Sequence, residues 1–461
     1  MLGLSKKVHI HFVGIGGIGM SGIAEVLLSL GYPISGSDLA QNPTTEALAA
    51  KGARVCIGHR AENLADADLV VYSTAIDPTN PEIALARQRR IPIVRRAEML
   101  AELMRLKYGI AIAGSHGKTT TTSMVATIFH LAKRDPTHII GGVVSNLGGH
   151  AKKGDGDVLI AEADESDGSF LFLNPIMAVV TNVDNDHLDY HKTEENIRRA
   201  FVEFVNRIPF YGKVALNAQD AGTRMILPEV KRQYVLFGLE GLRLEGQSLD
   251  YSASNISFAP GATSFELLHK GVAQGTVSLA VSGQHNVMNA LAAIAISHEA
   301  GISFADIRAG LAKFSGVGRR LESVLKRGAF EVIDDYGHHP TEIRATLRTL
   351  KDVYRKEICV VFEPHRYSRT QQLWTDFVES FHDASEVFVA PIYAASEAPI
   401  EGVDSRALVA DMVGRGVRAN YLASLDDMAE LLRQRASREM VFLTLGAGAI
   451  SKKIKSIAKE L

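Results

Sequence analysis

The sequence predicts an α/β protein that is built from mostly parallel sheets and divided into three domains. Short β-branched runs alternate with helical patterns along almost the whole chain, which is typical of parallel sheets wrapped by helices. The chain has 461 residues, roughly three times the usual length of one domain. Two of the strand-like runs end in glycine-rich turns that open helices, the setting in which α/β sheets bind nucleotides.

Composition and charge exclude several classes of protein. Hydrophobic residues make up 46% and charged residues 22% of the chain, so a mainly disordered protein is excluded. The 50 Lys and Arg residues against 52 Asp and Glu leave a net charge of −2. This balance argues against a nucleic-acid partner and against binding to a membrane surface.

The sequence also indicates the compartment. The two cysteines, Cys56 and Cys359, form neither a disulfide framework nor a metal-binding pair, and their scarcity suits a reducing cytosol. No apolar run reaches the roughly 18 residues that span a bilayer, and the N-terminus lacks the features of a signal peptide. We therefore expect a cytoplasmic protein without membrane insertion.

The first predicted domain, residues 1–106, begins with a glycine-rich turn. The strand-like run Val8–Val13 leads into Gly14-x-Gly16-Gly17-x-Gly19, which opens a helix. The second strand ends near Asp38, 19 residues after the last glycine of the turn. Taken alone this pattern is a fingerprint for a dinucleotide such as NAD, but the same turn binds the pyrophosphate of any nucleoside diphosphate. The glycines therefore leave the identity of the nucleotide open.

The second predicted domain, residues 107–313, contains the strongest single signal. The strand Gly109–Ala113 is followed by Gly114-Ser115-His116-Gly117-Lys118-Thr119-Thr120, which opens a helix. The backbone N–H groups of such a turn face an anion, and the helix N-terminus adds the positive end of its dipole. We expect Lys118 to reach the β- and γ-phosphates of a nucleotide and the Thr119 hydroxyl to hold Mg²⁺. The spacing is shorter than in the usual phosphate-binding motif, because Ile112 occupies the outer glycine position.

Two further strand ends of this domain carry groups that suit a phosphate or a metal. Glu162 directly follows the strand Val158–Ala161, and His187 comes soon after the strand Ala178–Thr181. Ligands of an open parallel sheet bind beyond the carboxyl ends of its strands. If these strands neighbour the strand before Lys118, Glu162 and His187 converge on the phosphates as Mg²⁺ ligands. A lone histidine is more often a polar core residue, but three such strand ends together favour the metal site.

The remaining motifs lie farther along the chain. Residues 240–282 predict short antiparallel strands, and the helix that follows carries His285 and Asn289 at i and i+4. The third predicted domain, residues 314–461, returns to the α/β pattern. Two of its strands end in Asp334-Asp335-Tyr336-Gly337-His338-His339-Pro340 and in Pro364-His365-Arg366-Tyr367-Ser368-Arg369. Two arginines three residues apart could clamp a small carboxylate, although surface arginines are commonly only solvated.

Taken in order over essentially the whole chain, these motifs resemble those of the Mur ligases, which build the peptide of bacterial cell-wall precursors. The resemblance rests on the two glycine-rich turns, on Glu162-Ala-Asp-Glu-Ser-Asp167 and on the two motifs of the third domain, which are highly specific. The chain departs from the family at residues 183–185, where Val-Asp-Asn replaces the frequent Ile-Glu-Ala. The resemblance implies a Rossmann-like N-terminal domain, a central P-loop ATPase-like domain with a mostly parallel sheet, and a Rossmann-like C-terminal domain.

The resemblance also implies an activity. In the Mur ligases with these motifs, ATP phosphorylates the lactyl carboxylate of UDP-N-acetylmuramate. The amine of L-alanine then attacks the acyl phosphate, and a tetrahedral intermediate collapses to the amide, ADP and phosphate. ATP and Mg²⁺ are thus the implied cofactors, and we expect a monomer or a homodimer.

Individual residues take roles from the same resemblance. The implied sugar-nucleotide contacts are Gly14, Gly16, Gly17, Gly19, Asp38 and Ser73. The implied ATP contacts are Gly114, Ser115, His116, Gly117, Lys118, Thr119, Thr120, His285, Asn289, Arg320 and Asp335. The implied catalytic residues are Lys118, Glu162, His187 and His338, with Thr119, Glu162 and His187 on the metal. The implied L-alanine contacts are Tyr336, His338, Arg366 and Arg369.

Three other functions are weighed against this one. A ligase that recycles murein tripeptide would use the same nucleotide sugar but differs in the motifs of the third domain. An NAD-dependent oxidoreductase would use the first glycine-rich turn and leave the second one unexplained. A regulatory nucleotide-binding protein without ligase chemistry would not need the histidines and arginines of the third domain.

Overall fold

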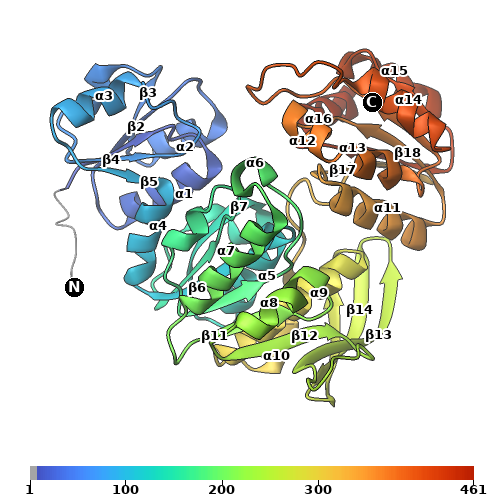
Figure 1. The fold of residues 1–461 in the computed structure, drawn as a ribbon, viewed down its shortest axis with the longest axis horizontal. Coiled ribbons are helices and arrows are strands. Elements are labelled where there is room, and N and C mark those ends of the chain that lie inside the picture. The colour runs from blue at the N-terminus through green and yellow to red at the C-terminus, as the bar shows by residue number, and fades with distance from the viewer. Residues whose placement is uncertain (1–7, 461) are drawn as a thin grey trace. The chain divides into compact units, whose positions relative to one another are not determined.

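The computed structural model describes residues 8–460, and its first sheet holds five parallel strands in the order β3-β2-β1-β4-β5 (Figure 1). The strands are β1 (Ile10–Val13), β2 (Ile34–Asp38), β3 (Arg54–Ile57), β4 (Leu69–Tyr72) and β5 (Ile93–Arg95). The helices are α1 (Ile18–Ser29), α2 (Pro43–Ala50), α3 (Pro81–Gln88) and α4 (Arg96–Arg105). Phe12 and Val13, adjacent in β1, are buried in two separate clusters. Because neighbouring side chains of a strand point to opposite faces, both faces of this sheet are covered.

The second sheet has ten strands in the order β15-β14-β13-β12-β11-β10-β6-β9-β7-β8. They are β6 (Tyr108–Ala113), β7 (Thr137–Val144), β8 (Gly149–Lys152), β9 (Val158–Glu162), β10 (Met177–Val180), β11 (Lys213–Asn217), β12 (Tyr234–Leu239), β13 (Tyr251–Ala259), β14 (Ala262–His269) and β15 (Val272–Leu279). The helices are α5 (Lys118–Leu131), α6 (Leu188–His191), α7 (Glu194–Asn206), α8 (Ala221–Ile226), α9 (Gln284–Glu299) and α10 (Phe304–Lys313). The strand β6 runs parallel to both of its neighbours, β9 and β10.

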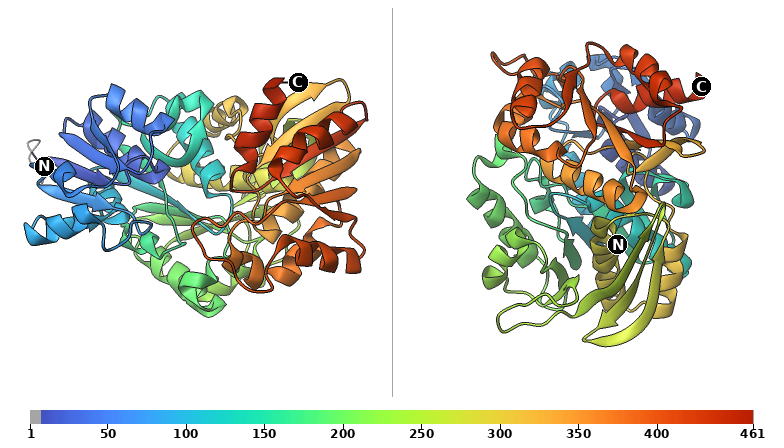
Figure 2. Two further views of the ribbon diagram at one scale, coloured as in Figure 1. Left: turned by 90° about the horizontal axis from the view of Figure 1, so that it is seen from above. Right: turned by 90° about the vertical axis from the view of Figure 1, so that its right-hand side faces the viewer.

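The strands β13, β14 and β15 form one antiparallel part of this sheet, and β7 and β8 form another. Two-residue turns join β13 to β14 and β14 to β15, a connection that antiparallel neighbours allow and parallel ones do not. Figures 1 and 2 show them as long yellow-green strands. The antiparallel arrangement agrees with the prediction for residues 240–282, but the strands have eight or nine residues each and are longer than the short strands expected.

The third sheet has six strands in the order β16-β17-β21-β18-β19-β20, and only the β16–β17 pair is antiparallel. They are β16 (Glu322–Arg327), β17 (Phe330–Asp335), β18 (Glu357–Phe362), β19 (Glu386–Val389), β20 (Ala419–Tyr421) and β21 (Met440–Leu445). The helices are α11 (Pro340–Tyr354), α12 (Tyr367–Gln372), α13 (Trp374–Val378), α14 (Ser405–Gly414), α15 (Met428–Arg435) and α16 (Ile450–Glu460). Two hydrophobic clusters, one containing Ile333 and Val360 and the other Val332 and Val361, cover the two faces.

The described chain forms two compact units. The first contains the residues up to 254, 266–277 and 288–314, and the second contains 255–265, 278–287 and the residues from 315 onward. The predicted α/β class with mostly parallel sheets is confirmed. The domain boundaries at residues 106 and 313 stay predictions. Among the described residues, none of the helices has the length and apolar character that crossing a membrane requires.

Candidate functional site

The turn between β6 and α5 requires glycine at two positions. Gly114 has φ +134° and Gly117 has φ +82°, which non-glycine residues rarely adopt. A Cβ atom at Gly114 would lie 1.9 Å from Thr181 Oγ1, and one at Gly117 would lie 2.4 Å from Asn289 Oδ1. The turn is therefore packed against the start of the loop after β10 and against α9. Its strand–turn–helix setting is the one that the sequence predicted for a phosphate site.

Lys118, the first residue of α5, folds back over this turn. Its Nζ donates to the carbonyl oxygens of Gly114 at 2.6 Å and Ser115 at 3.1 Å, and it lies 2.8 Å from each carboxylate oxygen of Glu165. Burial alone would lower the pKa of the Lys118 ammonium, but Glu165 and its acidic neighbours raise it overall. Lys118 therefore stays a cation at the phosphate turn.

Glu165 is a residue of this cluster to which the sequence analysis gave no role. Its side chain is almost fully buried, and burial raises the pKa of its carboxyl to about 7. His191 Nε2 lies 2.8 Å from its backbone carbonyl oxygen. The acidic run at residues 162–167 is the sequence feature that could have indicated Glu165. Such a run does not identify which of its carboxylates pairs with Lys118.

Glu162, the last residue of β9, lies in an arrangement that fits a magnesium ion. Its Oε2 is 3.2 Å from the Thr119 hydroxyl, and its Oε1 accepts from the backbone N–H of Gly141 at 2.6 Å. Adjacent oxygens in an octahedral magnesium shell are about 3 Å apart, so the carboxylate and the hydroxyl match two neighbouring positions. Burial raises the pKa of Glu162, and a bound cation would offset the cost of the buried anion.

His187 follows β10 and lies beside Glu165. Its Nε2 is 3.9 Å from Glu165 Oε1 and 3.4 Å from Asp186 Oδ2. The strand order β10-β6-β9 confirms the expectation that the three predicted strands are neighbours. Their carboxyl ends share one edge of the sheet, and the carboxylates beside His187 there are those of Asp186 and Glu165.

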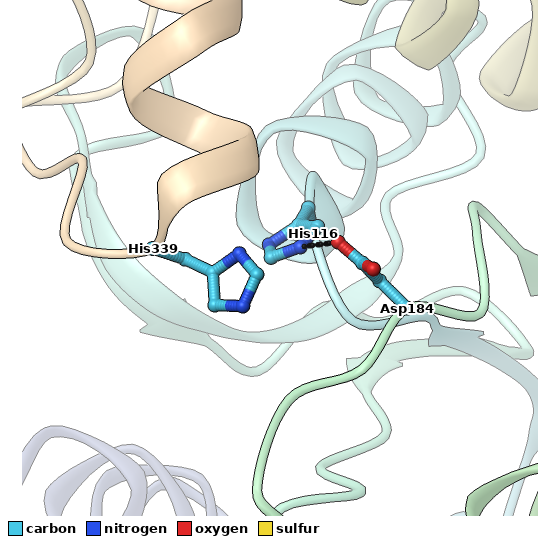
Figure 3. A group of neighbouring side chains, drawn as sticks. All are labelled: His116, Asp184 and His339. Carbon is cyan, nitrogen blue, oxygen red and sulfur yellow. Dashed lines mark hydrogen bonds and ion pairs between the residues drawn. The ribbon is translucent and has the colours of Figure 1, made fainter. Parts of the chain in front are cut away.

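Hydrogen bonds that the sequence did not predict fasten the turn to the loop after β10. His116 Nε2 lies 2.8 Å from Asp184 Oδ2 (Figure 3). The His116 carbonyl oxygen accepts from Thr181 Oγ1 at 2.6 Å and from Asn182 Nδ2 at 2.9 Å. Asp184 is one of residues 183–185, where the sequence departs from the family that it resembles, so this departure includes a residue that contacts the turn.

The helix α9 carries His285 and Asn289 one turn apart, as predicted. Asn289 Oδ1 accepts from the Thr121 hydroxyl at 3.3 Å, which joins α9 to α5. Burial lowers the pKa of His285 to about 4, and the nearby Arg320 acts in the same direction. The His285 imidazole is therefore neutral at pH 7.

The second compact unit holds the other residues predicted to contact ATP. Arg320 Nη1 lies 3.1 Å from Glu342 Oε1, and its guanidinium lies over the Tyr336 ring at 5.2 Å from the centroid. Asp335, the last residue of β17, is buried and accepts from two backbone N–H groups, each at 2.8 Å. Burial raises the pKa of this carboxyl. Each oxygen of Asp335 thus already has a backbone partner.

The residues predicted to bind the amino acid surround His365. The His338 ring lies 5.1 Å from the Tyr336 ring and 6.0 Å from the His365 ring, and Arg369 Nη1 is 3.3 Å from His365 Nδ1. Burial lowers the pKa of His365 to about 4, with Arg369 and Arg366 acting in the same direction. Two guanidinium groups beside a neutral imidazole suit a small carboxylate. The sequence motif contained His365 without assigning it a role.

The first glycine-rich turn is held by the carboxyl end of β2. The backbone N–H groups of Gly14 and Ile15 donate to the Ser37 carbonyl oxygen at 2.8 and 3.0 Å, and that of Gly16 donates to Asp38 Oδ2 at 2.8 Å. Gly17 and Gly19 lie at the start of α1, and Ser73 follows β4, the other neighbour of β1. The predicted sugar-nucleotide residues thus lie at one edge of the sheet. The Asp38 side chain binds the turn itself.

Comparison with known proteins covers nearly the whole chain. The model of the Mur ligase family, catalytic domain matches residues 9–108, that of the Mur ligase middle domain residues 112–297, and that of the Mur ligase, glutamate ligase domain residues 319–448. The UDP-N-acetylmuramate–L-alanine ligase of Geobacter sulfurreducens is 51% identical over 448 residues, 96% of each chain. The ligase of the same name from Trichlorobacter lovleyi is 48% identical over 455 residues, 98% of each chain.

Solved structures of ligases are also similar to this chain over nearly its whole length. The UDP-N-acetylmuramate–alanine ligase of Thermotoga maritima has a TM-score of 0.82 at 31% identity, covering 98% of each chain. A murein peptide ligase of Psychrobacter arcticus has a TM-score of 0.72 at 25% identity, again over 98% of each chain.

Proposed function

Because the chain belongs to the Mur ligase family, we propose that it joins L-alanine to the lactyl carboxylate of UDP-N-acetylmuramate at the expense of ATP. The product would enter peptidoglycan precursor synthesis. The observation that carries the proposal is the cluster at the adjoining ends of β9, β6 and β10, where a phosphate turn meets Lys118, Glu162 and Glu165. Similarity over almost the full length of the alanine ligases supports the choice of substrates.

Phosphoryl transfer needs positioning and charge neutralisation more than covalent help. Lys118 would bind the β- and γ-phosphates, which its retained charge supports. Thr119 and Glu162 would hold Mg²⁺, with His187 at a second ion, and the metal would neutralise charge on the phosphate oxygens. The lactyl carboxylate would attack the γ-phosphate, release ADP and become an acyl phosphate.

The second step is attack by the amine of L-alanine. Arg366 and Arg369 would hold the alanine carboxylate, while Tyr336 and His338 orient the amine. His338 would take the proton that the amine must lose before it attacks. The tetrahedral intermediate then collapses to the amide and releases phosphate.

The nucleotides have separate sets of residues in this proposal. The turn at Gly14–Gly19, with Asp38 and Ser73, would bind the UDP group. Along with the Gly114–Thr120 turn, His285, Asn289, Arg320 and Asp335 would contact ATP. The cytoplasmic location and the monomeric or homodimeric state remain predictions.

A phosphate-release assay tests the function. We expect release only when ATP, Mg²⁺, UDP-N-acetylmuramate and L-alanine are all present, with L-alanine preferred over serine and glycine. Activity with the murein tripeptide in place of L-alanine would instead assign the recycling reaction. Release that does not depend on UDP-N-acetylmuramate would contradict both ligase functions.

A further inference from the structure

The helix α3, which follows β4 of the first sheet, carries a buried carboxylate that belongs to none of the sites described above. Glu82, the second residue of α3, has no exposed surface. Its Oε2 accepts from the Ser37 hydroxyl at 2.6 Å, and its Oε1 accepts from Asn63 Nδ2 at 2.5 Å and from the Arg60 backbone N–H at 3.3 Å. A buried carboxylate destabilises a fold unless such bonds satisfy it. Each oxygen of Glu82 is satisfied.

The surroundings of Glu82 favour its ionised form. Burial would raise the pKa of its carboxyl, but the nearby His11 imidazole and the hydrogen bonds from Ser37 and Asn63 bring the pKa below its ordinary value. His59 Nδ1 lies 3.4 Å and His11 Nε2 3.8 Å from Glu82 Oε2. Glu82 is therefore an anionic acceptor, and a charged acceptor makes stronger hydrogen bonds than a neutral one.

One of these bonds leads directly to the glycine-rich turn. Ser37 donates its hydroxyl to Glu82, while its carbonyl oxygen accepts from the backbone N–H groups of Gly14 and Ile15. The next residue, Asp38, accepts from Gly16. The position of Ser37 thus sets both the start of the turn and the carboxylate that follows it. A shift at Ser37 would move the backbone that faces the nucleotide.

We infer that Glu82 is a positioning residue for the sugar nucleotide: it fixes Ser37 and, through Ser37, the Gly14–Gly16 turn. It does not touch the substrate. The inference rests on the proposed function for the ligand at this turn, the UDP group of the sugar nucleotide. A network that served only to stabilise the domain would change the melting temperature without changing the affinity for one substrate.

The same strand supplies a matched control. Ser35 and Ser37 lie two residues apart in β2, so they face the same side, and both are fully buried. The Ser35 hydroxyl also lies near histidines, 2.8 Å from His9 Nε2 and 2.8 Å from His11 Nδ1. Only Ser37 bonds to Glu82 and to the turn. The replacements Ser35→Ala and Ser37→Ala therefore remove the same group from similar surroundings.

The experiment compares wild type with Glu82→Gln, Ser37→Ala and Ser35→Ala. It measures kcat, the melting temperature and the KM values for ATP, UDP-N-acetylmuramate and L-alanine. The dissociation constant for UDP-N-acetylmuramate is measured separately by calorimetry without ATP. Loss of one hydrogen bond to a charged group corresponds to about a tenfold change in affinity. We expect Glu82→Gln and Ser37→Ala to raise KM and Kd for UDP-N-acetylmuramate by about that factor, with KM for ATP and L-alanine and kcat changed less than twofold. Ser35→Ala should leave all three KM values unchanged.

The outcomes separate the inference from the proposed function. A wild-type protein that neither binds nor consumes UDP-N-acetylmuramate overturns the proposed function. A wild-type ligase whose Ser37→Ala variant keeps the normal KM and Kd overturns the inference and leaves the proposed function standing. Equal effects of Ser35→Ala and Ser37→Ala on the Kd also overturn it, because they would mean a general loss of packing. If Glu82→Gln does not fold, the comparison of the two serine variants decides.

Discussion

Lys118, which we propose binds the phosphates of ATP, shows how the fold can fix the position of a single side chain. Its ammonium group is held by two carbonyl oxygens of the turn and by Glu165, so its position is set before any ligand binds. The raised pKa keeps the group charged despite burial. Such a preorganised charge costs little reorganisation when negative charge develops on the transferred phosphoryl group.

Replacing Lys118 with alanine is expected to remove most of the activity and to leave binding of the sugar nucleotide intact. Loss of a charged contact to the transferring group should lower the rate by a factor on the order of 10² to 10⁵. Initial rates and calorimetric binding of UDP-N-acetylmuramate measure the two effects. Replacement of the exposed Lys231 serves as the control. Near-normal turnover in Lys118→Ala would show that the lysine does not serve the transferring phosphate.

Arg366 is a residue with a strained backbone. It has φ +70°, which is uncommon outside glycine and costs on the order of 1 kcal/mol or more. Its backbone N–H donates to the Tyr393 carbonyl oxygen at 2.8 Å, and its Nε lies 3.9 Å from Glu397 Oε1. Strain of this kind is retained where surrounding contacts hold it, and it gathers at functional sites. The observation therefore favours Arg366 as a residue of the amino-acid site.

We expect Arg366→Lys to raise the KM for L-alanine about tenfold, because lysine keeps the charge but loses the planar fork that binds a carboxylate. The KM values for ATP and UDP-N-acetylmuramate should change much less. Measuring the three KM values side by side for Arg366→Lys and Arg369→Lys checks this. An unchanged alanine KM in both variants would place the amino-acid site elsewhere.

At the scale of the elements, the sequence predicts where the strands before the candidate residues end. It does not predict which side chains contact one another at those ends. The runs before Gly14, Lys118 and Glu162 are short, apolar and followed by special residues, so their strands were predicted. The edge strands β3, β5 and β16 are only partly buried, and their apolar stretches of three residues or fewer are too short to mark a strand. Glu165 was missed for another reason: its pairing with Lys118 depends on β9 lying beside β6, which no local pattern encodes.

Replacing Gly117 tests the packing of α9 against the Gly114–Thr120 turn. Gly117→Ala adds a Cβ that would lie 2.4 Å from Asn289 Oδ1, and it forces alanine into φ +82°. Gly416 has the same φ, +82°, with no atom within 4 Å of an added Cβ, so Gly416→Ala carries the backbone strain alone. We expect both variants to lose about 1 kcal/mol of unfolding free energy from strain. Only Gly117→Ala should lose further stability and most of its ATP affinity. Urea unfolding and ATP binding measure both, and identical behaviour of the two variants would contradict the packing argument.

At the scale of the whole molecule, the three sheets have their candidate site residues in the same place, at the carboxyl ends of strands. Candidate site residues lie at or just after the carboxyl ends of β1, β6, β9 and β10 in the first compact unit. In the second unit they lie at the carboxyl ends of β17 and β18. Parallel strands bring such ends to one edge, so residues far apart in the sequence meet without long loops. Because of this regularity, the residues that follow the predicted strands in the sequence include most of the candidate site residues.

Buried histidines contribute a term to the stability of the whole chain that depends on pH. Burial lowers the pKa values of His138, His285 and His365 to about 4, against 6.5 for a free imidazole. Through these three histidines the unfolded chain binds more protons than the folded chain between pH 6.5 and 4, so their contribution to stability falls as the pH drops through this range. The buried carboxyl of Glu165, whose pKa is raised to about 7, acts in the opposite direction. His138, in β7, is 3% exposed, and its Nε2 has no hydrogen-bond partner among the residues that the structure describes.

Replacing His138 with leucine should reduce this acid sensitivity without touching the candidate site. A histidine pKa that folding lowers from 6.5 to about 4 corresponds to a loss of at most about 3 kcal/mol at pH 4 and about 2 kcal/mol at pH 5. The leucine variant should therefore gain stability relative to wild type as the pH falls from 7 to 5, whatever the difference between the two proteins at pH 7. Urea unfolding at half-unit pH steps measures the difference. If the two curves stay parallel from pH 7 to pH 5, His138 is protonated equally in the folded and unfolded chains, and the acid sensitivity has another source.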